Sequence, residues 1–142
     1  MSRRLLFYTM EPGATAPQKA HRSDAGFDLY AREEAIIRAG GSHVFDTGLH
    51  VGIPEGYFGS IRSKSGLNVN HGIISDGVID AGYTGSIRVK LYNLSNEDYR
   101  VCEGDKISQL IIQPYEDDIC AILCASLPSS ERGDNGFGSS GR

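Results

Sequence analysis

The chain has 142 residues and a formal net charge of −4, which is the size of one domain with room for a hydrophobic core. It contains no apolar run long enough to span a bilayer, and its acidic balance disfavours a stable nucleic-acid-binding surface. A small anionic ligand is not excluded, because it needs only a few cations and backbone N–H groups.

The N-terminus begins with a basic pair, and the short apolar run Leu5–Tyr8 follows it. This run is too short for the apolar region of a secretory signal peptide, and Glu11-Pro12-Gly13 ends it. We therefore predict a strand here. Without an export signal, a cytoplasmic protein is expected.

Three further segments predict β-strands by the spacing of their apolar residues. Val44–Ile53 and Ser86–Asn93 alternate between apolar and polar residues, as half-buried strands do. Ile107–Gln113 is almost continuously apolar, which suits a buried strand, and Pro54-Glu55-Gly56 marks a turn. The residues expected to face the core are Leu49, Val51, Ile53, Ile87, Val89 and Leu91.

Three other segments give less regular signals. Arg32–Ala39 has a helix-forming composition but no good N-cap, so we predict a strand or a short irregular piece. Ser63–His71 is the one stretch that can sustain a helical period. Asp76-Gly77 lies between the apolar pairs Ile73-Ile74 and Val78-Ile79, which predicts a β-hairpin. Many short strands and no internal linker predict a single all-β sandwich or barrel.

The three cysteines predict no disulfide framework, because their number is odd and the chain has no export signal. Cys120 and Cys124 have the spacing of half a zinc site, but no second Cys/His pair with zinc spacing accompanies them. On a strand, Cys120, Ile122 and Cys124 would share one face, and we expect this stripe to pack in the core.

The chain changes composition at Ser126, and Ser, Gly, Arg, Asp and Asn dominate from there. Leu127 and Phe137 are the only large apolar residues in this part, so it cannot bury enough surface to order itself. Two interpretations stay open, a frayed end and a tail that becomes ordered over a ligand.

Four polar, glycine-containing segments carry side chains suited to nucleotide chemistry. Asp24–Asp28 offers two carboxylates, and Arg62–Leu67 offers cations and hydroxyls that suit phosphate oxygens. Gly77–Gly85 places Asp80 after two β-branched residues, where it can contact water. Arg132–Gly141 combines arginine and hydroxyls with one aromatic residue, and it does not match a P-loop. Each segment alone suits an ordinary loop, but together they indicate a nucleotide enzyme.

The order and the residues of these segments closely resemble the motifs of the trimeric dUTPase family, and all five motifs have a counterpart here. One motif would be weak evidence, whereas five in the right order are hard to obtain otherwise. The matching segments are Asp24–Ala31, Arg62–Leu67, Gly77–Gly85 continuing into Ile87–Asn93, Gly104–Leu110, and Arg132–Gly141.

The resemblance implies a distorted jelly-roll subunit, with residues 1–128 as the β domain and residues 129–142 as a mobile arm. It implies a homotrimer in which the arm of one subunit closes over a site built by its neighbours. The implied reaction is hydrolysis of dUTP to dUMP and pyrophosphate, which keeps dUTP low and supplies dUMP for dTMP synthesis. Mg²⁺ would be held mainly by the substrate phosphates, and indirectly by Asp28 through water. A regulatory protein partner is also compatible with the fold.

The resemblance also implies roles for single residues. Asp80 would be the base that activates the attacking water, and Tyr83 would lie beneath the deoxyribose. The backbone around Gly77 and Ile79 would pair with uracil, and Phe137 would stack on it. The other implied substrate-binding residues are Lys64, Ser65, Gly66, Gln109, Arg132, Gly138, Ser139 and Ser140.

The sequence departs from the commonest family pattern at Lys64, where arginine is usual, at Gly82, where an acid is frequent, and at Asn135, where glycine is frequent. Lysine keeps the charge of arginine but lacks its bidentate fork. Two alternatives are a dCTP deaminase-type relative and a non-catalytic regulatory binding module on the same fold. Thr84 counts against the first, because such deaminases use a glutamate near that position. The presence of Asp80 and of the tail counts against the second.

Overall fold

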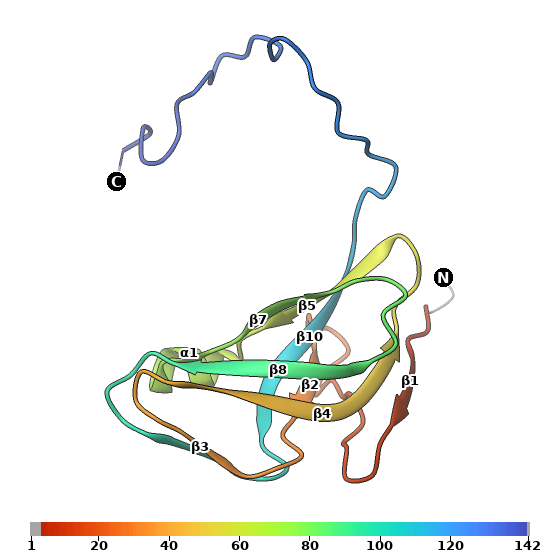
Figure 1. Ribbon diagram of the computed structural model, residues 1–142, viewed down its shortest axis with the longest axis vertical. Helices are drawn as coiled ribbons and strands as arrows, with labels where there is room; N and C mark the ends of the chain where they lie inside the picture. The colour runs from red at the N-terminus through yellow and green to blue at the C-terminus, as the bar shows by residue number, and fades with distance from the viewer. Residues whose placement is uncertain (1–3, 142) are drawn as a thin grey trace.

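The computed structural model describes residues 4–141, which form ten strands and one short helix (Figure 1). Residues 1–3 and 142, at the two ends of the predicted domain and arm, lie outside the described residues. The elements are β1 (Phe7–Met10), β2 (Phe27–Tyr30), β3 (Ala35–Ile37), β4 (Ser42–Gly52), β5 (Tyr57–Arg62), α1 (Ser65–His71), β6 (Ile73–Ile74), β7 (Asp76–Ile79), β8 (Ser86–Asn93), β9 (Tyr99–Val101) and β10 (Lys106–Pro114).

Two four-stranded sheets, in which neighbouring strands run antiparallel, form the body of the molecule. One has the strand order β1-β4-β8-β6 and the other β2-β10-β5-β7, while β3 and β9 form a separate pair. One hydrophobic core draws buried residues from both four-stranded sheets. The predicted all-β class, with a distorted jelly-roll arrangement, is confirmed.

The alternation predicted for β4 and β8 is present in the structure. The two strands pair with Phe45 opposite Val89, and both of these side chains are fully buried. Their pairing shifts between Asp46 and His50, and Gly48 within this β-bulge has φ 69°. The residues predicted to face the core are all buried, namely Leu49, Val51, Ile53, Ile87, Val89 and Leu91.

The remaining regular predictions also agree with the structure. β10 covers the predicted strand Ile107–Gln113 and lies between β2 and β5. The turn at Pro54-Glu55-Gly56 is closed by a bond from Tyr57 N to the Pro54 carbonyl, at 3.2 Å. β1 falls on the end of the apolar N-terminal run, and β3 falls within Arg32–Ala39.

The helix predicted within Ser63–His71 is α1. It ends at Gly72, which has φ 67° and donates its N–H to the Asn68 carbonyl at 3.0 Å. A residue in this left-handed conformation commonly closes a helix, and glycine adopts it without a steric penalty. No residue of α1 is buried, so the helix lies on the surface.

The β-hairpin predicted at Asp76-Gly77 is wrong. β6 pairs with β8 in one sheet, whereas β7 pairs with β5 in the other. Asp76 and Gly77 are the first residues of β7 and lie opposite Arg62 and Ile61. The local turn signal fails because each apolar pair finds its partner strand in a different sheet, so the chain crosses between sheets at Ser75.

The core stripe predicted for Cys120, Ile122 and Cys124 is also wrong. After β10 the chain leaves the body and runs away from it, and residues 115–141 contain no strand or helix (Figure 1). The two cysteines are exposed, and Ile122 is 81% exposed. Apolar residues do alternate here, but among residues 4–141 no strand pairs with this segment.

Cys102, Cys120 and Cys124 are free thiols in the structure. Among residues 4–141, no helix is long and apolar enough to cross a bilayer.

Candidate functional site

The carboxylate of Asp28 is held between two lysines. β2 places Asp28 opposite Gln109 of β10, and its side chain is only 9% exposed. Lys64 Nζ donates to Asp28 Oδ1 at 2.5 Å, and Lys106 Nζ lies 3.5 Å from Oδ2. A buried carboxylate needs such partners, because an unpaired buried charge is strongly destabilising. The ion pair therefore ties the Arg62–Leu67 segment to the sheet beneath it.

Hydrogen bonds from buried and half-buried side chains fix the backbone of the same segment. Ser108 Oγ donates to the Arg62 carbonyl at 2.8 Å, and Gln109 Nε2 donates to the Ser63 carbonyl at 2.9 Å. Ser75 N donates to Ser63 Oγ at 2.9 Å. Because the Ser108 proton is used, Ser75 Oγ donates to Ser108 Oγ at 2.7 Å. Gln109 has a second amide N–H that this bond leaves for a ligand.

Ser65 and Gly66, which begin α1, are exposed. The Lys64 carbonyl accepts a bond from Asn68 N at 2.9 Å, which closes the first turn of the helix. The hydroxyl and backbone groups of Ser65 and Gly66 are therefore presented on the surface beside the partly buried Asp28–Lys64 pair.

Asp80 begins a loop that joins the two sheets, between the end of β7 and the start of β8 at Ser86. Tyr83 N donates to the Asp80 carbonyl at 3.2 Å, and Gly82 has φ 84°, a conformation that favours glycine. Asp80 is exposed and makes no ion pair within the part of the chain that the structure describes. It lines a shallow hollow together with Phe58, Val78, Ala81 and Tyr115.

The other predicted residues of this motif lie close to Asp80 in the chain. Tyr83 is 44% exposed, and its hydroxyl donates to the Ser86 carbonyl at 3.0 Å, which fixes the ring across the loop. Gly77 and Ile79 belong to β7, the last strand of its sheet. A strand at the edge of a sheet presents backbone N–H and C=O groups to a ligand.

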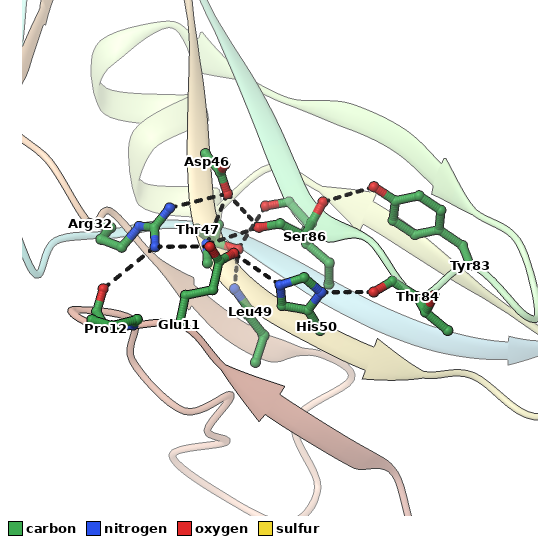
Figure 2. A network of polar contacts seen from close by, with 12 residues as sticks. Glu11, Pro12, Arg32, Asp46, Thr47, Leu49, His50, Tyr83, Thr84 and Ser86 are labelled. Atoms are coloured by element: carbon green, nitrogen blue, oxygen red, sulfur yellow. Dashed lines mark hydrogen bonds and ion pairs between the residues drawn. The ribbon is translucent and has the colours of Figure 1, made fainter.

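A polar network fastens the end of this loop to the bulge in β4 (Figure 2). His50 Nδ1 lies 2.7 Å from the Thr84 carbonyl, and its Nε2 lies 2.9 Å from Glu11 Oε2. These contacts raise the pKa of His50, the Thr84 carbonyl having the larger effect and Glu11 the next. The network was not predicted from the sequence.

Asp46 occupies the other side of the bulge. Its Oδ1 accepts a short bond from Ser86 Oγ and one of 3.0 Å from Gly48 N, and it lies 3.5 Å from Arg32 Nη2 (Figure 2). The bond from Ser86 is the main cause that holds the pKa of Asp46 below its usual value. The network joins separate segments of the sequence, around Glu11, Arg32, Asp46–His50 and Thr84–Ser86, which together form no motif. The one sequence signal is that His50 occupies a polar position in an alternating strand.

The predicted arm residues lie apart from the body (Figure 1). Arg132 Nε donates to the Asn135 carbonyl at 2.7 Å, so this end of the arm forms a local turn. Phe137 is fully exposed and has φ 50°, which is unusual for a residue other than glycine. Arg132, Asn135, Ser139 and Ser140 together line a hollow in the arm itself.

The structure therefore gathers the predicted residues into three groups rather than one. Asp28 and Arg62 are both level with Gln109 in their sheet, whereas Ile79 lies opposite Gly59 at the other end of β5. Three strand spacings and about three residues along the strands put roughly 17 Å between the Asp28 and Ile79 backbones. Lys64 follows Arg62 beyond one end of β5, whereas Asp80 follows Ile79 toward the other end, so the two residues leave the β5–β7 pair at opposite ends.

Asp28 is the predicted metal-supporting residue, and its surroundings limit how it can serve. Carboxylate oxygens suit Mg²⁺, but both oxygens of Asp28 already face ammonium groups, from Lys64 and Lys106. This donor set fits an ion that takes most of its ligands from phosphates and reaches Asp28 through water. It does not fit an ion bound directly by several protein side chains.

Comparisons with known proteins agree on one family. The family model of dUTPase matches residues 13–141. The deoxyuridine 5'-triphosphate nucleotidohydrolase of Candida albicans is 40% identical over 140 residues, which cover 97% of this chain and 88% of that protein.

Solved structures agree with that match. A Staphylococcus bacteriophage 80alpha dUTPase with dUPNHPP superposes with a TM-score of 0.90 at 28% identity, over 99% of this chain and 100% of that chain. A mutant dUTPase from phage phi11 of S. aureus, described with a structural Mg(II) ion, superposes with a TM-score of 0.73 at 27% identity. This match covers 90% of the present chain and 97% of the phage chain.

Proposed function

The chain belongs to the dUTPase family, and we propose that it hydrolyses dUTP to dUMP and pyrophosphate at a site composed of the three groups described above. The observation that carries the proposal is the family match over residues 13–141, which includes all three groups. This reaction keeps dUTP low and supplies dUMP for dTMP synthesis. The dCTP deaminase alternative is not favoured, since the matched relative is named as a nucleotidohydrolase.

We propose that the site is completed in a homotrimer. The separation of Asp28 from the Asp80 loop supports this, because copies of the chain can bring together groups that one chain keeps apart. Exposed apolar residues that follow β10 and precede the arm support it as well, because a group of exposed apolar side chains marks an interaction surface. Their exposures are 74% for Ile119, 81% for Ile122, 99% for Leu123 and 83% for Leu127. Residues up to 128 would form the domain, and the arm from residue 129 would close a neighbour's site.

Asp80 is the proposed base. Hydrolysis at the α-phosphorus needs a water molecule in line with the leaving pyrophosphate. The carboxylate would accept a proton from this water while the water oxygen bonds to phosphorus and the bond to pyrophosphate breaks. Two features support the assignment, namely its exposure to solvent and a loop whose two ends are fixed in different sheets.

The triphosphate would lie against the Arg62–Leu67 segment. The hydrogen bonds to the Arg62 and Ser63 carbonyls already order this backbone, so binding loses little conformational entropy there. Lys64 has donors beyond the one that Asp28 uses, and Arg132 of the arm would add charge where the pyrophosphate leaves. The proposed phosphate contacts are Lys64, Ser65, Gly66, Gln109, Arg132, Gly138, Ser139 and Ser140.

Recognition of uracil would use the free edge of β7 rather than the predicted hairpin. The backbone around Gly77 and Ile79 can offer donors and acceptors to uracil, whereas cytosine presents the complementary pattern and leaves buried groups unpaired. Tyr83 would lie beneath the sugar and leave no room for a ribose 2′-hydroxyl. Phe137 would stack on the base when the arm closes.

Mg²⁺, when bound, would neutralise charge on the three phosphates and fix their conformation. Asp28 would support it through a water molecule. We also propose a cytoplasmic location, in keeping with three exposed free thiols, which are typical of a reducing compartment. A regulatory protein partner remains a proposal that a pull-down with and without nucleotide would test.

Replacing the proposed base gives the first prediction. We expect Asp80→Asn to lower kcat by about 10²–10⁴-fold, the usual contribution of general-base catalysis, while an imido analogue of dUTP still binds. Pyrophosphate release and calorimetry measure the two quantities. The matched control is Asp76→Asn, an exposed acid at the start of β7, the strand that precedes Asp80. Turnover of Asp80→Asn at the wild-type rate would contradict the assignment.

Substrate choice is tested in the same assay. Pyrophosphate release from dUTP, dTTP, dCTP and UTP, with and without Mg²⁺, should be highest for dUTP with the metal. Release of ammonia from dCTP would instead indicate the deaminase.

A further inference from the structure

His50 lies between two groups that can only accept hydrogen bonds. Its Nδ1 is 2.7 Å from the Thr84 carbonyl, and its Nε2 is 2.9 Å from Glu11 Oε2 (Figure 2). A neutral imidazole carries one N–H donor, whereas the imidazolium carries two. Both contacts are therefore satisfied together only when the ring is positively charged.

The β-bulge in β4 places the ring there. The pairing of β4 with β8 shifts between Asp46 and His50, and it resumes with His50 opposite Ser86, the first residue after the loop. On its other side, His50 lies opposite Thr9 of β1, next to the turn that contains Glu11. The bulge thus aims one side chain at the catalytic loop and at the N-terminal segment simultaneously.

The bond to Thr84 is the only side-chain hydrogen bond that reaches residues 80–85 from another element, within the part of the chain that the structure describes. The other two bonds of the loop, from Tyr83 N to the Asp80 carbonyl and from the Tyr83 hydroxyl to Ser86, are local. Without His50, the end of the loop would be held by its own turn and by the start of β8.

We propose that His50 is a positioning residue for dUTP hydrolysis, which holds the loop of Asp80 and Tyr83 through the Thr84 carbonyl and is itself held by Glu11. The inference rests on the proposed function, because the loop matters for turnover only if Asp80 and Tyr83 act there. His50 would act through the loop backbone, because its ring contacts the Thr84 carbonyl and not the side chain of Asp80 or Tyr83.

Several charged or titratable groups face the ring from the surrounding elements. Glu11 follows β1 and Asp46 lies on β4, and both acids favour the charged ring. Arg32 lies 3.9 Å from Glu11. Arg88 of β8 lies opposite Asp46, and Tyr8 of β1 lines the hollow beside His50. The pKa of His50 is raised, first by the Thr84 carbonyl and then by Glu11.

The sign of the pH dependence follows from this raised pKa. Below it, the ring donates to both partners and the loop is fully held. As the pH rises through it, the ring loses one proton and can keep only one of the two bonds. The Glu11 carboxylate is the stronger acceptor, so the remaining N–H stays on Nε2 and the bond to Thr84 is lost. We therefore expect kcat to decline on the alkaline side, through the titration of His50.

Three substitutions separate the two bonds. In His50→Asn, the amide N–H takes the place of Nδ1 and can reach Thr84 without titrating. In His50→Gln, the longer amide reaches toward Glu11 instead, and His50→Ala removes both bonds. The matched control is His43→Ala, since His43 is on the same strand and bonds Glu33 at 3.0 Å, toward the opposite end of β4.

We expect kcat for dUTP to fall about tenfold in His50→Ala and in His50→Gln, since misplacing a catalytic group by about 1 Å can slow a reaction up to about 100-fold. His50→Asn should retain most of the wild-type kcat and lose the alkaline decline. Hydrogen exchange of the amides of residues 81–85 should speed up in the Ala and Gln variants and stay slow in His43→Ala.

Two results would overturn the inference. One is a kcat of His50→Ala equal to that of His43→Ala. The other is unchanged hydrogen exchange in residues 81–85. If Asp80→Asn proves fully active while exchange in this loop still depends on His50, the proposed function fails and the anchoring of the loop stands. If Asp80→Asn is inactive and His50→Ala is not slowed, the function stands and the inference fails.

Discussion

Two serine hydroxyls support the backbone of the Arg62–Leu67 segment. Ser75 is 5% exposed and Ser108 is fully buried, and their hydroxyls lie 2.7 Å apart. Ser108 Oγ donates its hydrogen bond to the Arg62 carbonyl, so removal of the Ser108 hydroxyl takes a partner from both this carbonyl and Ser75 Oγ. Buried polar groups without partners are more costly than the net gain of a single hydrogen bond.

We therefore expect Ser108→Ala to lower the free energy of unfolding by about 1–3 kcal/mol, the usual cost of unsatisfied buried groups. Urea unfolding at one fixed protein concentration measures it, since the stability of an oligomer depends on concentration. The double variant with Ser75→Ala should lose less than the sum of the two single variants. Ser42→Ala, at an exposed position of β4, is the control. An equal effect of Ser108→Ala and Ser42→Ala would mean that the hydroxyl pair contributes nothing.

At the scale of elements, α1 depends on the residue that ends it. Gly72 has φ 67°, and a Cβ added there would lie 3.3 Å from Ser95 N. Gly66 lies within the same helix, and a Cβ added there would meet no other atom within 4 Å. The two glycines thus make a matched pair, one required by the backbone and one not.

Gly72→Ala should lower the free energy of unfolding by about 1 kcal/mol or more, because alanine is strained at this φ. Gly66→Ala should raise it by about 0.5–1 kcal/mol, because alanine favours helix. Urea midpoints of both variants, measured side by side, give the comparison. A stabilised Gly72→Ala variant would show that the helix end is not under this constraint.

The sequence predicted some elements well because their signals are local. The apolar alternation in β4 and β8, with Leu49 and Ile87 among its members, reports burial directly. The Asp76-Gly77 hairpin failed because its apolar neighbours belong to different sheets, which local turn preference cannot reveal. The prediction of a core stripe at Cys120 failed because alternation shows which side chains share a face, but not what that face packs against.

The same distinction applies to the candidate site. Motif residues such as Asp80 and Lys64 were found because they lie in short segments that resemble a family pattern. The contact of His50 with Thr84 and Glu11 could not be found this way, because it joins three distant parts of the chain through a bulge. The ion pair of Lys64 with Asp28 was hidden for the same reason.

At the scale of the whole molecule, the arm is the part most easily tested. We expect a chain that stops after Pro128 to keep its fold and its oligomeric state, since β10 ends at Pro114 and the apolar residues from Ile119 to Leu127 remain. It should lose most of its kcat/KM for dUTP, by about 100-fold, because Arg132 and Phe137 no longer complete the site. Circular dichroism, light scattering and pyrophosphate release measure the three properties.

The full-length Asp134→Ala variant is the control for this truncation, since Asp134 is an exposed arm residue that is not among the proposed contacts. An unaffected kcat/KM in the truncated chain would mean that the arm is only a frayed end.

The loop of Asp80 begins in one sheet and ends in the other, because β7 pairs with β5 and β8 pairs with β4. The spacing between packed sheets, about 10 Å, therefore sets the distance between its two ends. Core side chains such as Leu110 and Ile87, which are fully buried, act as spacers for the loop that carries the proposed base. A change in core volume would alter the reach of Asp80 unless the loop changed with it. Core residues and the loop of Asp80 are thus expected to change together as relatives of this chain accumulate substitutions.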